Sequence, residues 1–271
     1  MSGPQVGVNA MAGINRIAPQ LSGPALFDQD WLSVFFLHWA VDPVDVASLF
    51  PRGTRPDEFN GATYVGLVPF RMVRAGVGRG LPTPYLGTFL ECNVRLYSVD
   101  DQGRHGVVFL SLEASRWVTG MSARWGYRLP YTWARMHVRQ RGARWRWLSQ
   151  RRYPRGGDSM ELSLDVGDPI EPTDLEVFYT ARWGLHSTLA GRTLWTPNEH
   201  QPWSLRSAHV VSLEEDLISR AGVDVRGGPT ERVLYSPGVH TTFGRPVPVG
   251  YVPTSQEVRM PHIAARRTVG R

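Results

Sequence analysis

Residues 91–115, ECNVRLYSVDDQGRHGVVFLSLEAS, decide the fold class of this chain. Polar and apolar residues alternate through 91–99 and again through 107–115, as in strands that bury one face. The intervening DDQGRHG has the glycine and aspartate content of a turn, so the segment predicts a β-hairpin. Alternation places three polar side chains on one face of the first strand: Glu91, Asn93 and Arg95. On the returning strand it groups Ser111, Glu113 and Ser115.

Similar patterns recur along the chain. Further strands are predicted at 31–41, 62–73, 132–140, 143–153, 160–166, 192–213 (two strands) and 231–244. Short helices are predicted at 44–50, 173–182 and 213–222. Asp42 suits the N-cap of the first helix, and Thr173 with Glu176 resembles a capping box. Antiparallel hairpins with isolated helices predict an α+β, mainly antiparallel β fold.

The domain organisation is simple. No shift in composition marks a boundary, so we expect a single domain over 27–252. Residues 1–26 are rich in glycine and proline and predict a flexible N-terminal segment. Residues 253–271 predict a basic, loosely ordered tail. The longest apolar run, 31–41, is too short to span a bilayer, and the single cysteine suits a reducing compartment. We therefore expect a cytoplasmic protein that does not enter the membrane.

All 30 basic residues counted as Lys plus Arg are arginines, so the 271-residue chain has no lysine. Arginine stays protonated and delocalised and does not form imines with carbonyl substrates. The absence of lysine therefore argues against three classes of protein: Schiff-base enzymes, pyridoxal enzymes with an internal aldimine, and P-loop nucleotidases.

Several blocks of sequence occur in a specific order. They are HWAVDPVDVASLFPRG, FNGATYVGLVPFRM, the 91–115 hairpin, YRLPYTWARM and VLYSPGVHTTFGRP. Over roughly residues 30–245 this order resembles the YqjF-like family of uncharacterised bacterial proteins, which is grouped with the acetoacetate decarboxylase-like superfamily. The resemblance implies an antiparallel sheet curled into a cone or barrel with a central cavity, usually in a homo-oligomer.

The resemblance also bears on activity. The decarboxylase forms an imine through a lysine that, by rough position, would fall within 121–131 of this chain. Only Arg124 and Arg128 are basic there, and no lysine exists elsewhere. If the chain is an enzyme, it is not an imine-forming decarboxylase, and a lyase or hydrolase type of reaction without a Schiff base is the expectation.

A cavity for a small organic acid or carbonyl compound needs a cation for the anion and a carboxyl or phenol for proton transfer. The candidate catalytic residues are Glu91, Glu113 and Tyr131. The candidate substrate-binding residues are Arg71, Asn93, Arg95 and Arg128. These groups converge if the polar faces of the first hairpin point into the barrel. The alternative is an ion-pair ladder that faces solvent.

The second hairpin region carries a different signal. Residues 124–155 hold ten arginines, interleaved with tryptophans, and no Asp or Glu. The alternative function is thus a non-catalytic module that binds an acidic partner or nucleic acid. No nucleic-acid motif accompanies the arginines, so nucleic acid is disfavoured. A solvated face with arginine stems over tryptophan explains them equally well.

We expect neither a metal nor a cofactor. The histidines are widely spaced, and Cys92 has no thiol partner and alternates onto the apolar face. The glycine-rich segment 74–82 has Leu81 where a dinucleotide fingerprint needs its last glycine, so we interpret it as a loop over the cavity mouth. His38, within FFLHWA, is interpreted as a hydrogen-bonded structural histidine. Arg182 and His186 are interpreted as residues of a helix end rather than of a ligand site.

Overall fold

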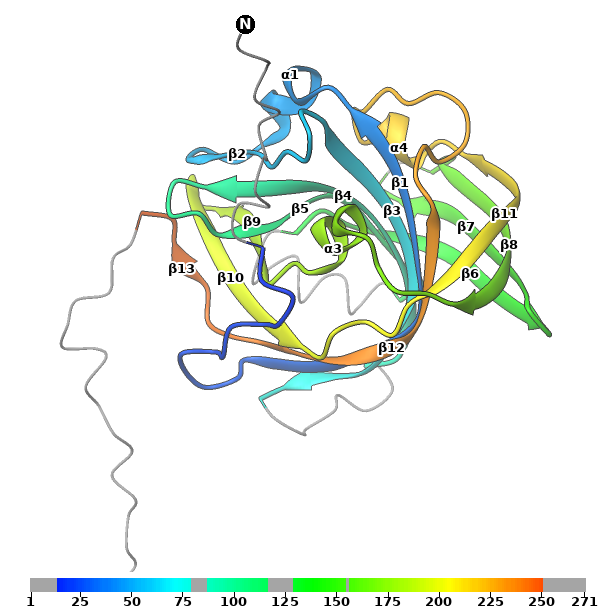
Figure 1. The fold of residues 1–271 in the computed structure, drawn as a ribbon, viewed down its shortest axis with the longest axis horizontal. Helices are drawn as coiled ribbons and strands as arrows, with labels where there is room; N and C mark the ends of the chain where they lie inside the picture. The colour runs from blue at the N-terminus through cyan, green and yellow to red at the C-terminus, as the bar shows by residue number, and fades with distance from the viewer. Residues whose placement is uncertain (1–13, 79–86, 117–128, 155, 251–271) are drawn as a thin grey trace, which may run out of the picture.

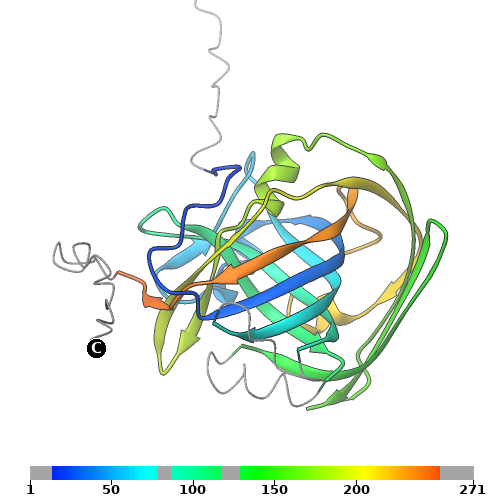
Figure 2. The same cartoon turned by 90° about the horizontal axis from the view of Figure 1, so that it is seen from below.

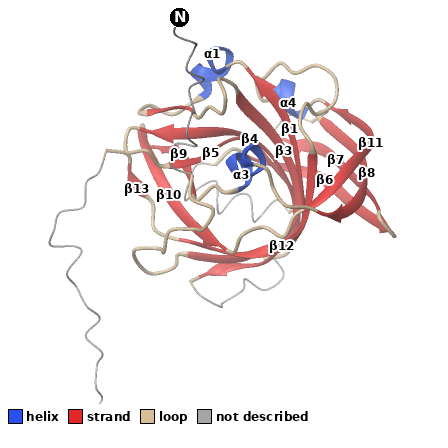
Figure 3. Ribbon diagram, viewed as in Figure 1, coloured by secondary structure: helices blue, strands red, loops and turns tan. Residues whose placement is uncertain are grey.

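Strands dominate the structure, a computed structural model that describes residues 14–78, 87–116, 129–154 and 156–250 (Figure 3). The strands are β1 (Phe27–Val41), β2 (Thr54–Pro56), β3 (Thr63–Val77), β4 (Phe89–Asp100), β5 (His105–Ala114), β6 (Tyr131–Arg141), β7 (Arg144–Tyr153), β8 (Ser159–Pro169), β9 (Gly184–Leu189), β10 (Arg192–His200), β11 (Arg206–Glu215), β12 (Val233–Phe243) and β13 (Val247–Pro248). The helices of the described residues are α1 (Pro43–Val46), the 3-10 helix η1 (Ala47–Leu49), α3 (Asp174–Thr180) and α4 (Leu217–Arg220). The pairings are antiparallel apart from β5–β6 and β5–β9. The predicted fold class is confirmed.

The sheet closes on itself in two circuits that share one wall. Strands β12, β1, β3, β4 and β5 form the wall. On one side β5 continues through β6, β7, β8 and β11 back to β12. On the other side β5 meets β9, and β10 returns to β12. Figure 1 shows the second circuit as a ring with α3 inside it, which we call the α3 compartment.

Each side of the wall has its own hydrophobic core. The core behind the wall joins it to the inner faces of β6, β7 and β8, where Trp147 and Leu162 are fully buried. The core of the α3 compartment packs Phe178 and Tyr179 of α3 against the wall. Because both faces of β1 are covered from Val34 to Trp39, this stretch is nearly continuous in apolar residues, as expected for a doubly buried strand.

The local predictions mostly hold. Both predicted hairpins form, as β4–β5 and β6–β7, and Gly142 takes a φ of 60° in the second turn. The capping box of Thr173 and Glu176 is present at α3, and Asp42 caps α1 through the N–H of Val44. The helices are shorter than predicted. The last one begins only at Leu217, because the preceding residues pair with β8.

Two hydrogen bonds join the described part of the N-terminal segment to the rest of the protein. The carbonyl of Asn15 accepts a hydrogen bond from the indole of Trp183 at 2.7 Å, and the N–H of Leu21 donates to Glu199 at 3.2 Å. Residues Asn15 and Leu21 therefore contact the domain. The rest of that segment, 1–13, and the predicted tail 253–271 lie outside the described residues. No helix in the described ranges is long and apolar enough to cross a membrane.

Candidate functional site

The polar face of β4 points into the α3 compartment. Cys92, Val94 and Leu96 belong to the core behind the wall, so the alternate residues face the other way. These are Glu91, Asn93, Arg95 and Tyr97. Glu91 and Asn93 are each only 3% exposed, so an ion-pair ladder on solvent is excluded for this face.

Glu91 is the most perturbed carboxyl of the compartment. The hydroxyl of Tyr131 donates a hydrogen bond to its Oε2 at 3.0 Å. Burial raises the pKa of Glu91 from an ordinary value of 4.5 to about 8, although hydrogen bonds from Tyr131 and Asn93 favour the charged form. Burial and the neighbouring carboxyl also raise the pKa of Tyr131. Glu91 is therefore largely protonated near neutral pH and can donate a proton as well as accept one.

Arg95 lies four residues along the same strand face. Its Nε donates to the hydroxyl oxygen of Tyr97 at 3.1 Å, and Nη2 donates to the carbonyl of Tyr179 at 3.1 Å. The guanidinium carbon lies 5.6 Å from the ring centroid of Phe36. Among the described residues no carboxylate pairs with it. Arg95 thus presents an uncompensated cation whose remaining donors suit a carboxylate.

His38 belongs to the same network. Its Nε2 lies 2.5 Å from the hydroxyl of Tyr97, and its ring stacks on Tyr179 at a centroid distance of 3.9 Å. Burial and then the charge of Arg95 lower the pKa of His38, so the imidazole is neutral. Gly66 makes room, since a Cβ there would lie 3.0 Å from Nε2 of His38. His38 is buried and hydrogen-bonded, as predicted.

A second buried arginine closes the far end of this network. Arg182 donates to the carboxylate of Asp57 and to the carbonyl of Phe178, and its guanidinium lies 4.2 Å from the centroid of the Phe178 ring. Asp57 also forms a hydrogen bond with the imidazole of His105, whose Nδ1 lies 2.7 Å from Oδ2 of Asp57. Arg182 therefore binds the end of α3, as predicted, and pairs with Asp57, whereas His186, which was predicted at the same helix end, lies in β9.

Aromatic side chains form another part of the compartment. Trp31 of β1 stacks on Trp203 at a centroid distance of 6.1 Å and makes an edge contact with Phe70 at 5.9 Å. His200 lies 4.9 Å from Trp203, and burial lowers its pKa to about 4. Phe70 is the cross-strand neighbour of Glu91, so this apolar surface adjoins the perturbed carboxyl.

Several buried polar atoms in the compartment have no hydrogen-bond partner among the described residues. They include Trp31 Nε1, Asn93 Oδ1, His38 Nδ1, the Tyr179 hydroxyl and Nη2 of Arg182. Buried polar atoms are normally satisfied, and unsatisfied ones concentrate where something else binds. These unpaired atoms lie in the same compartment as the Glu91 carboxyl and the Arg95 cation.

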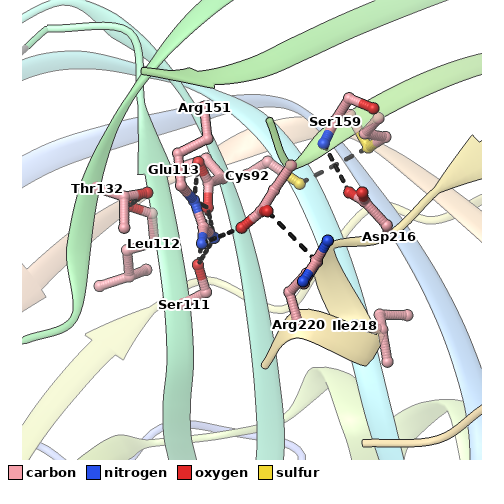
Figure 4. Close-up of polar contacts among 12 residues, drawn as sticks. Cys92, Ser111, Leu112, Glu113, Thr132, Arg151, Ser159, Asp216, Ile218 and Arg220 are labelled. Atoms are coloured by element: carbon pink, nitrogen blue, oxygen red, sulfur yellow. Dashed lines mark hydrogen bonds and ion pairs between the residues drawn. The ribbon is translucent and has the colours of Figure 1, made fainter. Parts of the chain in front are cut away.

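Glu113 does not join this site, which corrects the predicted convergence. Arg95 pairs with Phe109, but Val94 pairs with Ser111, so Leu110 forms a bulge in β5. The extra residue turns Glu113 opposite Cys92 instead of Glu91, onto the far face of the wall. There it is fully buried and forms an ion pair with Arg151, supported by Ser111 (Figure 4). Its role in this position is structural.

Two other predicted residues are also absent from the site. Arg71 is exposed and pairs with Leu90, so it points to the opposite face from its neighbour Phe70. Arg128 lies outside the described residues, as does the 121–127 segment before it. Cys92 is a free, buried thiol whose pKa burial raises, which matches the prediction of an inert cysteine. The described parts of the chain hold no cluster of His, Cys, Asp or Glu that could hold a metal ion.

A serine–histidine–aspartate arrangement appears elsewhere, and sequence reasoning missed it. Ser98 Oγ lies 2.8 Å from Nδ1 of His186, whose Nε2 lies 3.2 Å from Asp100. Ser98 is 0% exposed. Nε of Arg104 also donates to Asp100 at 2.6 Å. This buried group joins β9 to the end of the first hairpin.

Sequence reasoning also missed Tyr97 and Tyr179, which complete the polar network. Tyr97 follows from the alternation already seen in 91, 93 and 95, if it is extended by one more pair of residues. Tyr179 has no such signal, because only the tertiary placement of α3 brings it onto His38.

Comparison with known proteins agrees with this architecture. Residues 28–240 match the model of DUF2071, a family described as an uncharacterized conserved protein. The chain belongs to this family. It is 29% identical over 183 residues to the uncharacterized protein YqjF of Bacillus subtilis (strain 168), covering 66% of this chain and 75% of YqjF.

Solved structures share the fold. The enduracididine biosynthesis enzyme MppR complexed with pyruvate superposes with a TM-score of 0.60 at 15% identity, over 84% of this chain and 91% of MppR. Acetoacetate decarboxylase from Legionella pneumophila superposes with a TM-score of 0.58 at 12% identity, over 91% of this chain and 98% of the decarboxylase. These superpositions show that this member of the DUF2071 family has an acetoacetate decarboxylase-like fold. At such low identities they show the fold alone.

Proposed function

We propose that the α3 compartment binds a small organic molecule that carries a carboxylate or carbonyl group, with Arg95 holding the anion and Glu91 with Tyr131 serving proton transfer. The observation that carries the proposal is the Glu91 carboxyl. It is almost fully buried, its hydrogen-bond partners are a phenol and an amide, and its pKa is about 8. A carboxyl tuned to titrate near neutral pH is typical of acid–base sites.

The spacing along β4 suits a molecule of a few carbon atoms. At about 3.3 Å per residue, the Cα atoms of Glu91 and Arg95 lie about 13 Å apart, with Asn93 midway. Side chains extending from both ends leave room for a ligand whose anionic end meets Arg95 and whose reacting carbon or oxygen meets Glu91. The unpaired Oδ1 of Asn93 can accept a hydrogen bond from the middle of such a ligand.

The proposed chemistry excludes a covalent imine. MppR is described in complex with pyruvate, which supports a small oxo acid as the class of ligand. This chain has no lysine, so such a ligand stays non-covalent. The Glu91 carboxylate can take a proton from the carbon next to the carbonyl, which leaves the C–H electron pair as an enolate, and protonated Glu91 can return that proton to the carbon. This supports a lyase or hydrolase type of step without a Schiff base.

Isothermal titration with pyruvate, longer 2-oxo acids and the matching 2-hydroxy acids tests the proposal. We expect saturable binding that Arg95→Gln weakens by at least about tenfold, the typical cost of losing a charge-assisted hydrogen bond to a bound anion. Arg71→Gln is the matched control, since it removes an exposed arginine from the opposite face of the wall. Equal losses from Arg95→Gln and Arg71→Gln, or a complete absence of binding, would contradict the site.

Borohydride reduction in the presence of pyruvate tests the non-covalent mode separately. We expect no adduct on any side chain, because the terminal α-amino group is the sole primary amine of a lysine-free chain. Peptide mass mapping distinguishes that terminus from the domain. A reduced adduct within residues 27–252 would overturn the exclusion of imine chemistry.

A further inference from the structure

The outer face of the β6–β7 hairpin carries a row of arginines that the proposed small-molecule site does not use. Alternate residues of β6 point outward and are exposed: Trp133, Arg135, His137, Arg139 and Arg141. Their neighbours on the inner face are Ala134, Met136 and Val138, which pack on the core behind the wall. The strand therefore presents cations on one face and apolar groups on the other.

Ion pairs neutralise arginines of β7 but not those of β6. On β7, Arg144 pairs with Asp165 and Arg146 pairs with Glu161, both on β8. Those carboxylates lie on the far side of β7 from β6. Among the described residues, none forms an ion pair with the arginines of β6.

The cross-strand pairing of β6 with β7 adds to this excess of positive charge. Arg139 lies directly opposite Arg146, and Arg141 lies directly opposite Arg144. Like charges in directly opposite positions repel one another. Acidic groups on the open side of β6 would relieve this repulsion.

Among the described residues, the side of β6 away from β7 is a free sheet edge beyond residue 133. Strand β5 pairs with β6 only through the three residues Tyr131, Thr132 and Trp133. From residue 134 to residue 141 the described strands pair with β6 on its β7 side alone. Half of the backbone N–H and C=O groups of this stretch therefore point to an unpaired edge, a template for an added strand. Figure 2 shows the hairpin, in green, curving along the outside of the molecule.

We propose that the β6 edge binds an extended acidic segment of another protein, which adds as a strand beside residues 134–141. Side chains of an added strand that share the outer face lie opposite the cations of β6, at the same repeat of about 6.7 Å for every second residue. Side chains on the inner face meet Ala134, Met136 and Val138. The matching partner alternates acidic and apolar residues, in the manner of peptides that extend a sheet.

A second copy of this chain is a poor occupant. Pairing two β6 edges would bring one arginine row against the other, which places like charges opposite each other. A nucleic acid matches the charge but makes no use of the backbone edge or of the apolar inner face. The combination of free edge, alternating cations and apolar neighbours favours the acidic strand.

Fluorescence anisotropy with two labelled ten-residue peptides of equal composition tests the pattern. One alternates Glu and Val, and the other has five Glu followed by five Val. We expect the alternating peptide to bind about tenfold more tightly, because it places a carboxylate opposite each cation. Its affinity should fall at least about tenfold between 50 and 300 mM salt, since exposed charges are screened. Equal binding of the two peptides would overturn strand addition.

Variants and modified peptides locate the contact. Arg135→Gln with Arg139→Gln should weaken the alternating peptide about tenfold. Arg192→Gln, at an exposed arginine that begins β10, is the matched control and should change nothing. N-methylation of all Glu residues or of all Val residues blocks opposite edges of the peptide strand, so one series should abolish binding and the other should retain it. Loss in both series or in neither, or tighter binding of a ten-nucleotide oligo-dT, would overturn the proposal.

Discussion

Replacing Glu91 by Gln should change how the stability of the protein depends on pH. The pKa of Glu91 is about 8 in the folded protein, against an ordinary value of 4.5. Between these values the unfolded chain has lost the proton while the folded protein still holds it. The folded state binds more protons, so its stability falls as the pH rises through this range and levels off above pH 8.

The magnitude follows from the pKa difference. Each pKa unit corresponds to about 1.4 kcal/mol, so the full loss between pH 4.5 and 8 approaches about 5 kcal/mol. Glutamine retains the shape of the side chain and an oxygen that accepts from Tyr131, but it does not titrate. Between pH 5.5 and 7.5 the free energy of unfolding of Glu91→Gln, relative to the parent protein, should therefore rise by about 2.5 kcal/mol.

Urea unfolding followed by circular dichroism at pH 5.5, 6.5, 7.5 and 8.5 measures this difference. Subtracting the unfolding free energy of the parent protein from that of the variant at each pH removes the contribution of all other titrating groups. Glu214→Gln is the control, because Glu214 is exposed on β11, and its difference should stay flat over the same range. A flat difference for Glu91→Gln, within about 0.5 kcal/mol, would refute the claim that burial keeps this carboxyl protonated. The acid–base role proposed for it would fall as well.

Two further substitutions test the packing around the wall. Gly66→Ala should cost about 1–3 kcal/mol of unfolding free energy, because the added Cβ would lie 3.0 Å from the ring Nε2 of His38. Gly228→Ala is the control and should be near neutral, because a Cβ there would have no atom within 4 Å. Arg151→Gln should cost about 3–5 kcal/mol because it leaves the buried carboxylate of Glu113 unpaired and removes a partner of Asp158, whereas Arg144→Gln, from an exposed pair, should cost much less. Adding Glu113→Gln to Arg151→Gln should recover part of the loss, and denaturant unfolding at pH 7 measures all of these. No recovery in the double variant would mean that the cost comes from lost packing rather than from the stranded charge.

The local pattern of residues predicted much of the fold. Period-two alternation and turn glycines located both hairpins, and side chains that cap helix ends located α1 and α3. These signals depend on neighbours in the chain, which is why they survive without tertiary information. The same alternation correctly grouped Glu91, Asn93 and Arg95 on one buried face.

The predicted site failed where one residue broke the alternation. Had β5 remained regular after Phe109, which pairs with Arg95, Glu113 would lie opposite Glu91 as predicted. The bulge at Leu110 shifts the register by one residue and moves Glu113 to the other face of the wall. Nothing in the composition of this strand distinguishes a regular ladder from a bulged one.

The sequence by itself determined the fold class, the hairpins, the family resemblance and the exclusion of imine chemistry, because each depends on residue types or on spacing within a segment. The tertiary structure alone decided that the sheet encloses two compartments and that the face bearing Glu91 turns toward α3. It also decided that Arg71 faces outward and that the arginines of β6 border a free edge. These features depend on which distant strands pair and in what register, and that choice is set by the summed packing of both cores rather than by any local pattern of residues.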